Sequence, residues 1–278
     1  MSADTYIADF LKQHDRDRYL STLVLTGPAR DAVQALYAFS ADVAAIPARV
    51  SEPGPGEIRL QWWTDALEGH EHGNVNQNPL AAALFSAIET YGLQTGPLVR
   101  LIAARRFDLY QDPMPDMDTF EGYAGETNST LYQYAATILN KGTAPDDGDA
   151  AGHLGVAHAL TGHLRALGYN AAHGHIYLPW SIFAANGVAE QQLFAGQETD
   201  GIHAAVGQIA DIAAEHLTAA RKAIALLPKP VRPAFAMTPI ISAQLKNIAK
   251  TAKPLAPLTP DPDWRAILRI ALWSMRNG

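Results

Sequence analysis

The chain has 278 residues, of which 48% are hydrophobic and 18% charged, and its formal net charge is −7. The absence of cysteine excludes disulfides, thiolate nucleophiles and Cys-ligated metal or iron–sulfur sites. The acidic balance argues against nucleic acid as a partner, because phosphate binding needs a basic face. No run approaches the roughly 18 apolar residues of a membrane span. The polar first twenty residues resemble no targeting signal, so a cytoplasmic protein is expected.

The spacing of the apolar residues predicts an all-α fold. Ala and Leu recur at three- and four-residue intervals, and the alternation typical of strands is nearly absent. Pro- and Gly-rich segments separate the helices without resembling domain linkers. One domain over residues 1–278 is therefore expected, with a loop at 251–262 and a C-terminal helix at 263–278. In chain order, the predicted helices cover residues 5–13, 28–46, 56–69, 78–91, 96–110, 117–140, 147–169, 200–227, 231–251 and 263–275.

The predicted helix 28–46 ends in a stretch with almost no polar chemistry. Tyr37 lies near its middle, and Asp42 is the one acid close to its end. The following turn carries only apolar side chains, among them Ala44 and Ala48. Because this stretch continues an apolar helix, it is expected to face the interior.

The next helices offer two candidate features. Trp62 and Trp63 are adjacent and so point about 100° apart on a helix. Core packing is expected for both, with pocket lining as the alternative. Asp108 and Asp112 lie four apart, so both carboxylates could face one Mg²⁺. Since Asp112 precedes Pro113, we expect instead a solvated helix end there.

Polar residues interrupt the predicted helix 117–140. The segment 126–129 reads Glu-Thr-Asn-Ser, and three of these types have poor helix propensity. Its side chains are predicted to hydrogen-bond across a cavity, to form a buried network or to lie on an exposed face. In the predicted helix 147–169, His153, His158 and His163 are five apart and therefore turn about 140° from one to the next. They are not expected to bind one metal ion.

The last predicted helix has an apolar stripe flanked by arginines. Core packing of this stripe is expected, and the alternative is a helix at a membrane interface, with Arg265, Arg269 and Arg276 toward anionic lipid. The stripe consists of Trp264, Ile267, Leu268, Ala271, Leu272 and Met275.

Four segments in fixed order resemble the squalene/phytoene synthase family of head-to-head prenyltransferases. Their most specific parts are L-Y-A-F at 36–39 and Y-L-P at 177–179. The resemblance implies an isoprenoid synthase-like helical bundle with a central cavity. Active members hold Mg²⁺ and a diphosphate leaving group with two aspartate-rich motifs, because carboxylates bind the ions that neutralise the departing anion. The resembling segments are 29–46, 59–69, 78–93 and 157–179.

Both aspartate motifs are missing at the matched positions. Alanines, including Ala44 and Ala48, replace the first cluster. In the second, Arg165 is kept, whereas Ala166 and Asn170 replace the two aspartates and His175 replaces an arginine. No catalytic residue, metal ligand or cofactor is therefore expected. Tyr37, Asp42, Ala44, Ala48, Glu126, Asn128, Arg165, Ala166, Asn170, His175 and Tyr177 are predicted to be remnants of the family's pocket.

The segments 16–39 and 123–140 are similar to a branch of this family that also lacks the aspartates and assists the assembly of mitochondrial complex I. This resemblance implies a non-catalytic protein that helps NADH:quinone oxidoreductase assemble. It would bind complex I subunits or assembly intermediates, in the cytoplasm or peripherally at the inner membrane.

Two alternatives remain open. In one, the protein is an active Mg²⁺-dependent prenyltransferase in which Asp42, Asp108, Asp112 or Glu126 replaces the missing ligands. In the other, the vacated cavity holds an isoprenoid or quinone without chemistry, because such pockets are mostly apolar with a few polar groups.

Overall fold

The computed structural model describes residues 3–70, 75–146 and 148–277. These residues form helices joined by turns and loops, and none of them lies in a β-strand, as the apolar spacing predicts. The α-helices are α1 (Ala3–His14), α2 (Arg16–Ser21), α3 (Gly27–Ala44), α4 (Pro53–Glu68), α5 (Pro79–Tyr91), α6 (Gly96–Arg105), α7 (Met117–Ala124), α8 (Thr130–Leu139), α9 (Gly148–Arg165), α10 (Leu167–Ala172), α11 (Trp180–Ala185), α12 (Glu190–Phe194), α13 (Asp200–Leu226), α14 (Thr238–Ile248) and α15 (Asp263–Asn277).

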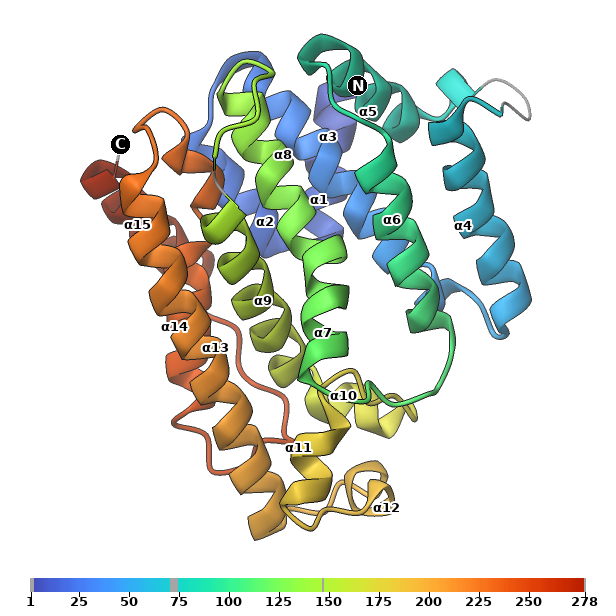
Figure 1. Ribbon diagram of the computed structural model, residues 1–278, viewed down its shortest axis with the longest axis vertical. Helices are drawn as coiled ribbons and strands as arrows, with labels where there is room; N and C mark the ends of the chain where they lie inside the picture. Colours follow the sequence, from blue (N-terminus) through green and yellow to red (C-terminus); the bar gives the residue numbers. More distant parts are fainter. Residues whose placement is uncertain (1–2, 71–74, 147, 278) are drawn as a thin grey trace.

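Helices α3, α8 and α9 form the centre of the bundle. Helices α1 and α5 pack on α3, and α13 and α14 pack on α9 (Figure 1). Helix α4 stands at one flank beside α6, and the short helices α10 to α12 close one end of the bundle. The core between these elements contains large, almost fully buried side chains, which anchor the packing through their apolar area. The aromatic ones are Tyr37, Phe39, Trp63, Phe120, Tyr132, Phe183 and Phe235.

Several predicted helices are interrupted where the local sequence changes. The predicted helix 96–110 becomes a 3₁₀ turn at Arg106–Leu109, and 117–140 contains a π-helical turn at Gly125–Ser129 between α7 and α8. The predicted helix 147–169 breaks at Ala166, and 231–251 begins with a 3₁₀ turn at Arg232–Phe235. Each interruption lets a neighbouring segment pack at a new angle.

Three short helices are absent from the predicted set. Helices α2, α11 and α12 have six, six and five residues. A helix this short spans less than two turns, so its apolar residues cannot repeat often enough to show a period. Residues 251–262, predicted as a loop, carry no helix before α15 begins.

The predicted core packing of the α15 stripe is wrong. Ala266 and Ile270 face the protein, whereas the stripe residues Trp264, Ile267 and Leu268 are exposed. No helix among the described residues combines the length and the apolar composition that crossing a bilayer requires.

Candidate functional site

Asp42, at the end of α3, is held by two donors. The Arg49 guanidinium donates to one carboxylate oxygen at 2.7 Å, and the Trp63 indole N–H donates to the other at 3.0 Å. Trp63 itself is buried and meets Phe39 edge to face, with ring centroids 4.9 Å apart. Trp62 lines a cavity of about 290 Å³ beside Asp42. Both oxygens of Asp42 are thus engaged in a partly buried network.

Ala44 and Ala48 are exposed, whereas Val43 and Ile46 of the same stretch are buried, so the expectation that the stretch faces inward is wrong for the two alanines only. Helix α3 ends at Ala44, and Pro47 begins a 3₁₀ turn to Arg49. Ala44 and Ala48 lie on either side of Pro47 with their methyl groups in solvent. The turn redirects the chain because proline removes a backbone donor and fixes φ. The turn after Asp42, residues 43–50, therefore supplies no side-chain oxygen ligand.

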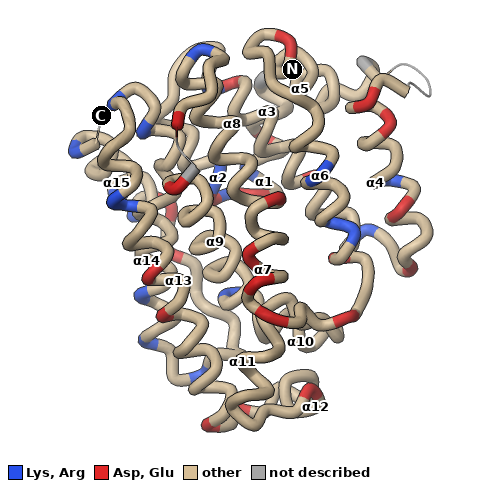
Figure 2. Tube along the Cα trace, viewed as in Figure 1, with Lys and Arg blue, Asp and Glu red and all other residues tan. Residues whose placement is uncertain are grey.

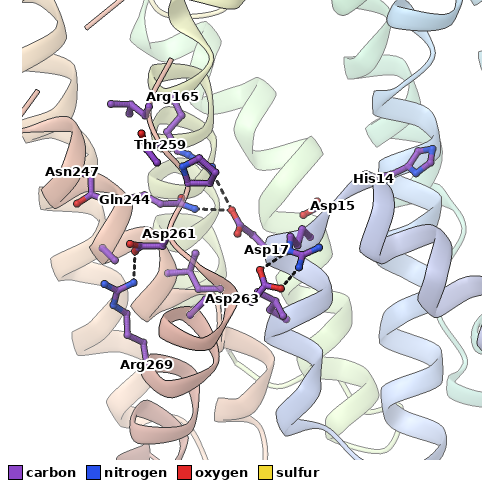
Figure 3. A pocket seen from close by; sticks show the side chains of 17 residues that line it. His14, Asp15, Asp17, Arg165, Gln244, Asn247, Thr259, Asp261, Asp263 and Arg269 are labelled. Atoms are coloured by element: carbon purple, nitrogen blue, oxygen red, sulfur yellow. Dashed lines mark hydrogen bonds and ion pairs between the residues drawn. The ribbon is translucent and has the colours of Figure 1, made fainter. Parts of the chain in front are cut away.

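Arg165 ends α9 and pairs with Asp17 of α2. Its Nη1 lies 3.0 Å from the carboxylate, and Gln244 Nε2 donates to the same oxygen at 2.6 Å (Figure 3). They line a cavity of about 330 Å³ bounded also by Asp261 and Asp263. Two further pairs, Arg16 with Asp263 and Arg269 with Asp261, border it. The cations and carboxylates of this cavity thus neutralise one another.

The rest of the second matched segment is a structural turn. Ala166 separates α9 from α10, and Asn170 lies on α10. The Asn170 carbonyl accepts from the backbone N–H groups of His173 and His175, at 3.0 and 2.9 Å. His175 lines a different cavity, of about 420 Å³, together with Asp108. Asp42, Arg165 and His175 therefore lie at three cavities, and the described structure does not bring them into one site.

Asp108 is buried, in contrast to the solvated helix end that the sequence indicates. Its side chain accepts from Arg105 Nη1 at 2.8 Å and from the Tyr123 hydroxyl at 2.9 Å. Only 5% of Asp108 is exposed. The 3₁₀ turn causes the difference, because it tightens the chain after Arg105 and turns the carboxylate toward α7. Asp112 is exposed, as predicted.

The groups around Asp108 have strongly shifted pKa values. Burial, followed by the charge of Asp108, raises the pKa of Tyr123 well above its usual range. Burial lowers the pKa of Arg105, but nearby Tyr123 and Asp108 outweigh that effect and raise it. His163 faces Tyr177 with ring centroids 5.1 Å apart. Burial and then the charge of Arg105 lower the pKa of His163 to about 3, so its ring is neutral at pH 7.

Tyr177, from the Y-L-P segment, belongs to the same cluster. Its hydroxyl donates to the Asp108 backbone carbonyl at 3.4 Å, and its ring stacks on His175 with centroids 5.4 Å apart. Burial, then the charge of Asp108, raises the Tyr177 pKa. The phenol is therefore a neutral donor that ties the segment after α10 to the 3₁₀ turn.

A second buried polar cluster surrounds Arg18 of α2. Its guanidinium donates to Asp15 at 2.9 Å and to the side-chain carbonyl of Asn128 at 2.7 Å. It also lies over the Tyr37 ring, 5.5 Å from the centroid. Asn128 belongs to the π-helical turn, which packs so closely on α9 that a Cβ at Gly155 would lie 2.1 Å from Ser129 Oγ.

The π-helical turn divides the polar segment 126–129 between two environments. Asn128 joins the buried network, which was one of the alternatives left open. Glu126 is partly exposed and lies 3.3 Å from the guanidinium of Arg100. Sequence reasoning did not identify Arg18, Arg105 or Tyr123, because Asn128 and Tyr123, which complete the two clusters, reach Arg18 and Arg105 from distant elements. Arg18 and Asn128 are separated by 110 positions, a distance at which no spacing rule applies.

The histidines of α9 are distributed around the helix, as expected. His158 Nδ1 lies 2.9 Å from the Tyr132 hydroxyl, and His153 lies beside His216 of α13. Among the residues that the structure describes, no three His, Asp or Glu side chains gather as a metal-binding group. The donor set at the matched positions also does not fit a magnesium–diphosphate cluster, because methyl and amide groups stand where carboxylates would be needed.

Known proteins similar to this chain include both an assembly factor and prenyl-chain synthases. A family profile described as squalene/phytoene synthase matches residues 11–268. NADH dehydrogenase (ubiquinone) complex I, assembly factor 6, from Bos taurus is 29% identical over 245 residues, 88% of this chain and 73% of that protein. Chloroplastic phytoene synthase 1 from Arabidopsis thaliana is 28% identical over 66% of this chain and 44% of its own length. A dehydrosqualene synthase crystal structure superposes with a TM-score of 0.81 at 19% identity, covering 99% of this chain and 97% of that one.

Proposed function

The chain belongs to the squalene/phytoene synthase family, and we propose that it performs no prenyl transfer and instead assists the assembly of respiratory complex I. The observation that carries this proposal is the donor set at the two matched motifs. Ala44, Ala48 and Ala166 have methyl groups at these positions, and Asn170 has an uncharged side-chain amide. The backbone carbonyl of Asn170 is also engaged, because it accepts hydrogen bonds within the turn that follows α10. Diphosphate ionisation needs divalent cations held by anionic oxygens, and these positions hold none.

The acids that could replace the missing ligands are engaged elsewhere. Asp42 is bound by Arg49 and Trp63, and Asp108 is bound by Arg105 and Tyr123. Glu126 faces Arg100. A carboxylate that already accepts from a guanidinium would have to lose that partner before it could bind a metal ion. These contacts support the non-catalytic function over the alternative of an active enzyme.

The assembly role is supported by the similarity to complex I assembly factor 6, which extends over most of both proteins. A catalytically inert bundle retains a large rigid surface, and such a surface can bind complex I subunits or assembly intermediates. We place the protein at the cytoplasmic face of the membrane, where a peripheral assembly factor meets its partners. Isoprenoid or quinone binding is not favoured by the cavity at Arg165, because ion pairs border it.

Deletion of the gene tests this proposal. We expect NADH:quinone oxidoreductase activity and the assembled complex on native gels to fall severalfold, while succinate:quinone activity stays unchanged. The wild-type gene should restore both readouts. Normal levels of assembled complex I in the deletion strain would contradict the assembly role.

Restoring the carboxylates separates assembly from catalysis. Wild-type protein incubated with farnesyl diphosphate and Mg²⁺ should release no pyrophosphate. The fourfold variant Ala44→Asp, Ala48→Asp, Ala166→Asp, Asn170→Asp should also release none, because the new carboxylates at positions 44 and 48 face solvent and do not meet those at positions 166 and 170 in one cavity. Mg²⁺-dependent pyrophosphate release by the wild type would show that the protein is a prenyltransferase.

A further inference from the structure

Helix α15 contacts the protein through one face and exposes an apolar stripe on the other. Ala266 and Ile270 are buried against the protein, and Trp273 packs beside them. On the stripe, Leu268 is 51% and Met275 74% exposed. A helix with one apolar face normally covers it against the protein, so a second apolar face in solvent indicates a binding surface. The exposed stripe consists of Trp264, Ile267, Leu268, Ala271, Leu272 and Met275.

The helix is fixed in this orientation by contacts at both ends. At its start, Asp263 pairs with Arg16 of α2. Further along the helix, Arg269 pairs with Asp261 of the preceding loop. At its end, the Arg232 guanidinium donates to the Asn277 carbonyl at 3.4 Å and to the Ala225 carbonyl of α13 at 3.0 Å. The stripe is therefore presented by a docked helix, which binds with less ordering cost than a free one.

Charged residues are distributed unevenly along the sequence, and the C-terminal part, which contains α15, is basic. Residues 216–278 contain ten Lys and Arg but only two Asp and no Glu, whereas residues 1–215 contain 11 Lys and Arg and 26 Asp and Glu. Figure 2 shows Lys and Arg along the edge of the molecule formed by α13, α14 and α15, where the first part of α13 also carries acidic residues. The exposed lysines here are Lys222, Lys229, Lys246, Lys250 and Lys253. This edge is positive although the protein is acidic.

We infer that the outer face of α15 binds an anionic membrane surface. The apolar stripe enters the boundary between headgroups and acyl chains, and the basic edge faces the phosphates. Trp264 starts the stripe, and the Arg265 guanidinium lies over its ring, 5.2 Å from the centroid. An indole beside a cation suits the interface, where one side of the pair is apolar and the other is hydrated. The inference rests on the peripheral location proposed above and names the surface responsible for it.

Vesicle flotation of the full-length protein tests the inference. The wild type should float with vesicles of 70% phosphatidylcholine and 30% phosphatidylglycerol, and much less with pure phosphatidylcholine. The variant Ile267→Gln, Leu268→Gln, Leu272→Gln should bind the anionic vesicles at least about tenfold more weakly, because three apolar side chains no longer enter the interface. Binding should also fall in 0.5 M NaCl, because salt screens the attraction to the headgroups.

A matched control and two other readouts make the outcome decisive. Ile58→Gln removes an equally apolar, highly exposed side chain from α4 and should bind like the wild type. Equal flotation of the triple variant and the wild type would overturn the inference, and so would absence of wild-type binding. A wild-type dimer in light scattering that the triple variant loses would assign the stripe to a second copy instead. Each of these results can occur while the deletion strain still shows the severalfold fall in assembled complex I, so this inference and the proposed function fail separately.

Discussion

Two regions of the molecule differ in how their side chains are satisfied. Buried charged side chains in the interior have specific hydrogen-bond partners, whereas six apolar side chains on the outer face of α15 are exposed to solvent. In the interior, Arg18 meets Asp15 and Asn128, and Arg105 meets Asp108 and Tyr123. A buried charge without such partners would cost several kcal/mol, so the fold depends on these contacts. The exposed stripe makes no comparable contribution to folding. The contrast separates residues that maintain the bundle from residues available for binding.

Removal of Asp108 should have the largest effect on stability. The variant Asp108→Ala leaves the guanidinium of Arg105 buried without its carboxylate, and we expect a loss of about 3–5 kcal/mol in the free energy of unfolding. Urea denaturation measures it. Asp112→Ala is the matched control, because that exposed side chain should change stability by no more than about 0.5 kcal/mol. Equal effects of the two substitutions would show that Arg105 reaches water.

Removal of Asn128 should have a smaller but clear effect. Asn128→Ala deletes the acceptor of a buried bond from Arg18, and a hydrogen bond to a charged group contributes about 1.5–3 kcal/mol. Glu126→Gln, on the same π-helical turn, alters only a partly exposed pair with Arg100 and should cost at most about 1 kcal/mol. The comparison fails if Glu126→Gln proves the more destabilising in urea.

Acidification should destabilise the protein through protonation of His163, which lies beside Tyr177 and Tyr123. Its pKa is lowered to about 3 in the folded protein by burial and then by Arg105, against an ordinary value near 6.5. The unfolded chain therefore binds the proton first. The contribution of neutral His163 to the free energy of unfolding is therefore fully present above about pH 6.5, and it is lost as the pH falls toward 3. His163→Gln should flatten this part of the profile of unfolding free energy against pH, and an unchanged slope would contradict the assignment.

Substitution of the α15 stripe should have the smallest effect on stability. The variant Ile267→Gln, Leu268→Gln, Leu272→Gln changes only exposed positions and keeps good helix formers, so its unfolding free energy should stay within about 1 kcal/mol of the wild type. Differential scanning calorimetry measures it. A loss of several kcal/mol would mean that the stripe supports the bundle and is not a free surface.

Much of the fold was predictable because helices are local. The period of apolar residues identified the long helices α3, α9 and α13 and the C-terminal helix α15. The site was less predictable. The loss of the motif carboxylates at Ala44, Ala48 and Ala166 can be read directly from aligned residue types, but the partners of the remaining acids cannot, because they lie on other helices. Asp108 illustrates this, since Tyr123 reaches it from α7.

The sequence by itself determined an all-α family member whose two metal-binding motifs lack their aspartates, since residue type and periodicity record both properties. Only the tertiary structure decided which apolar face of α15 is covered, that Ala44 and Ala48 face solvent, and that Arg18 donates a buried hydrogen bond to Asn128, 110 positions away. The physical reason is that amphipathicity specifies a face that avoids water but not the surface that covers it. Burial of a charge, likewise, depends on partners that only the packed bundle brings within hydrogen-bond distance.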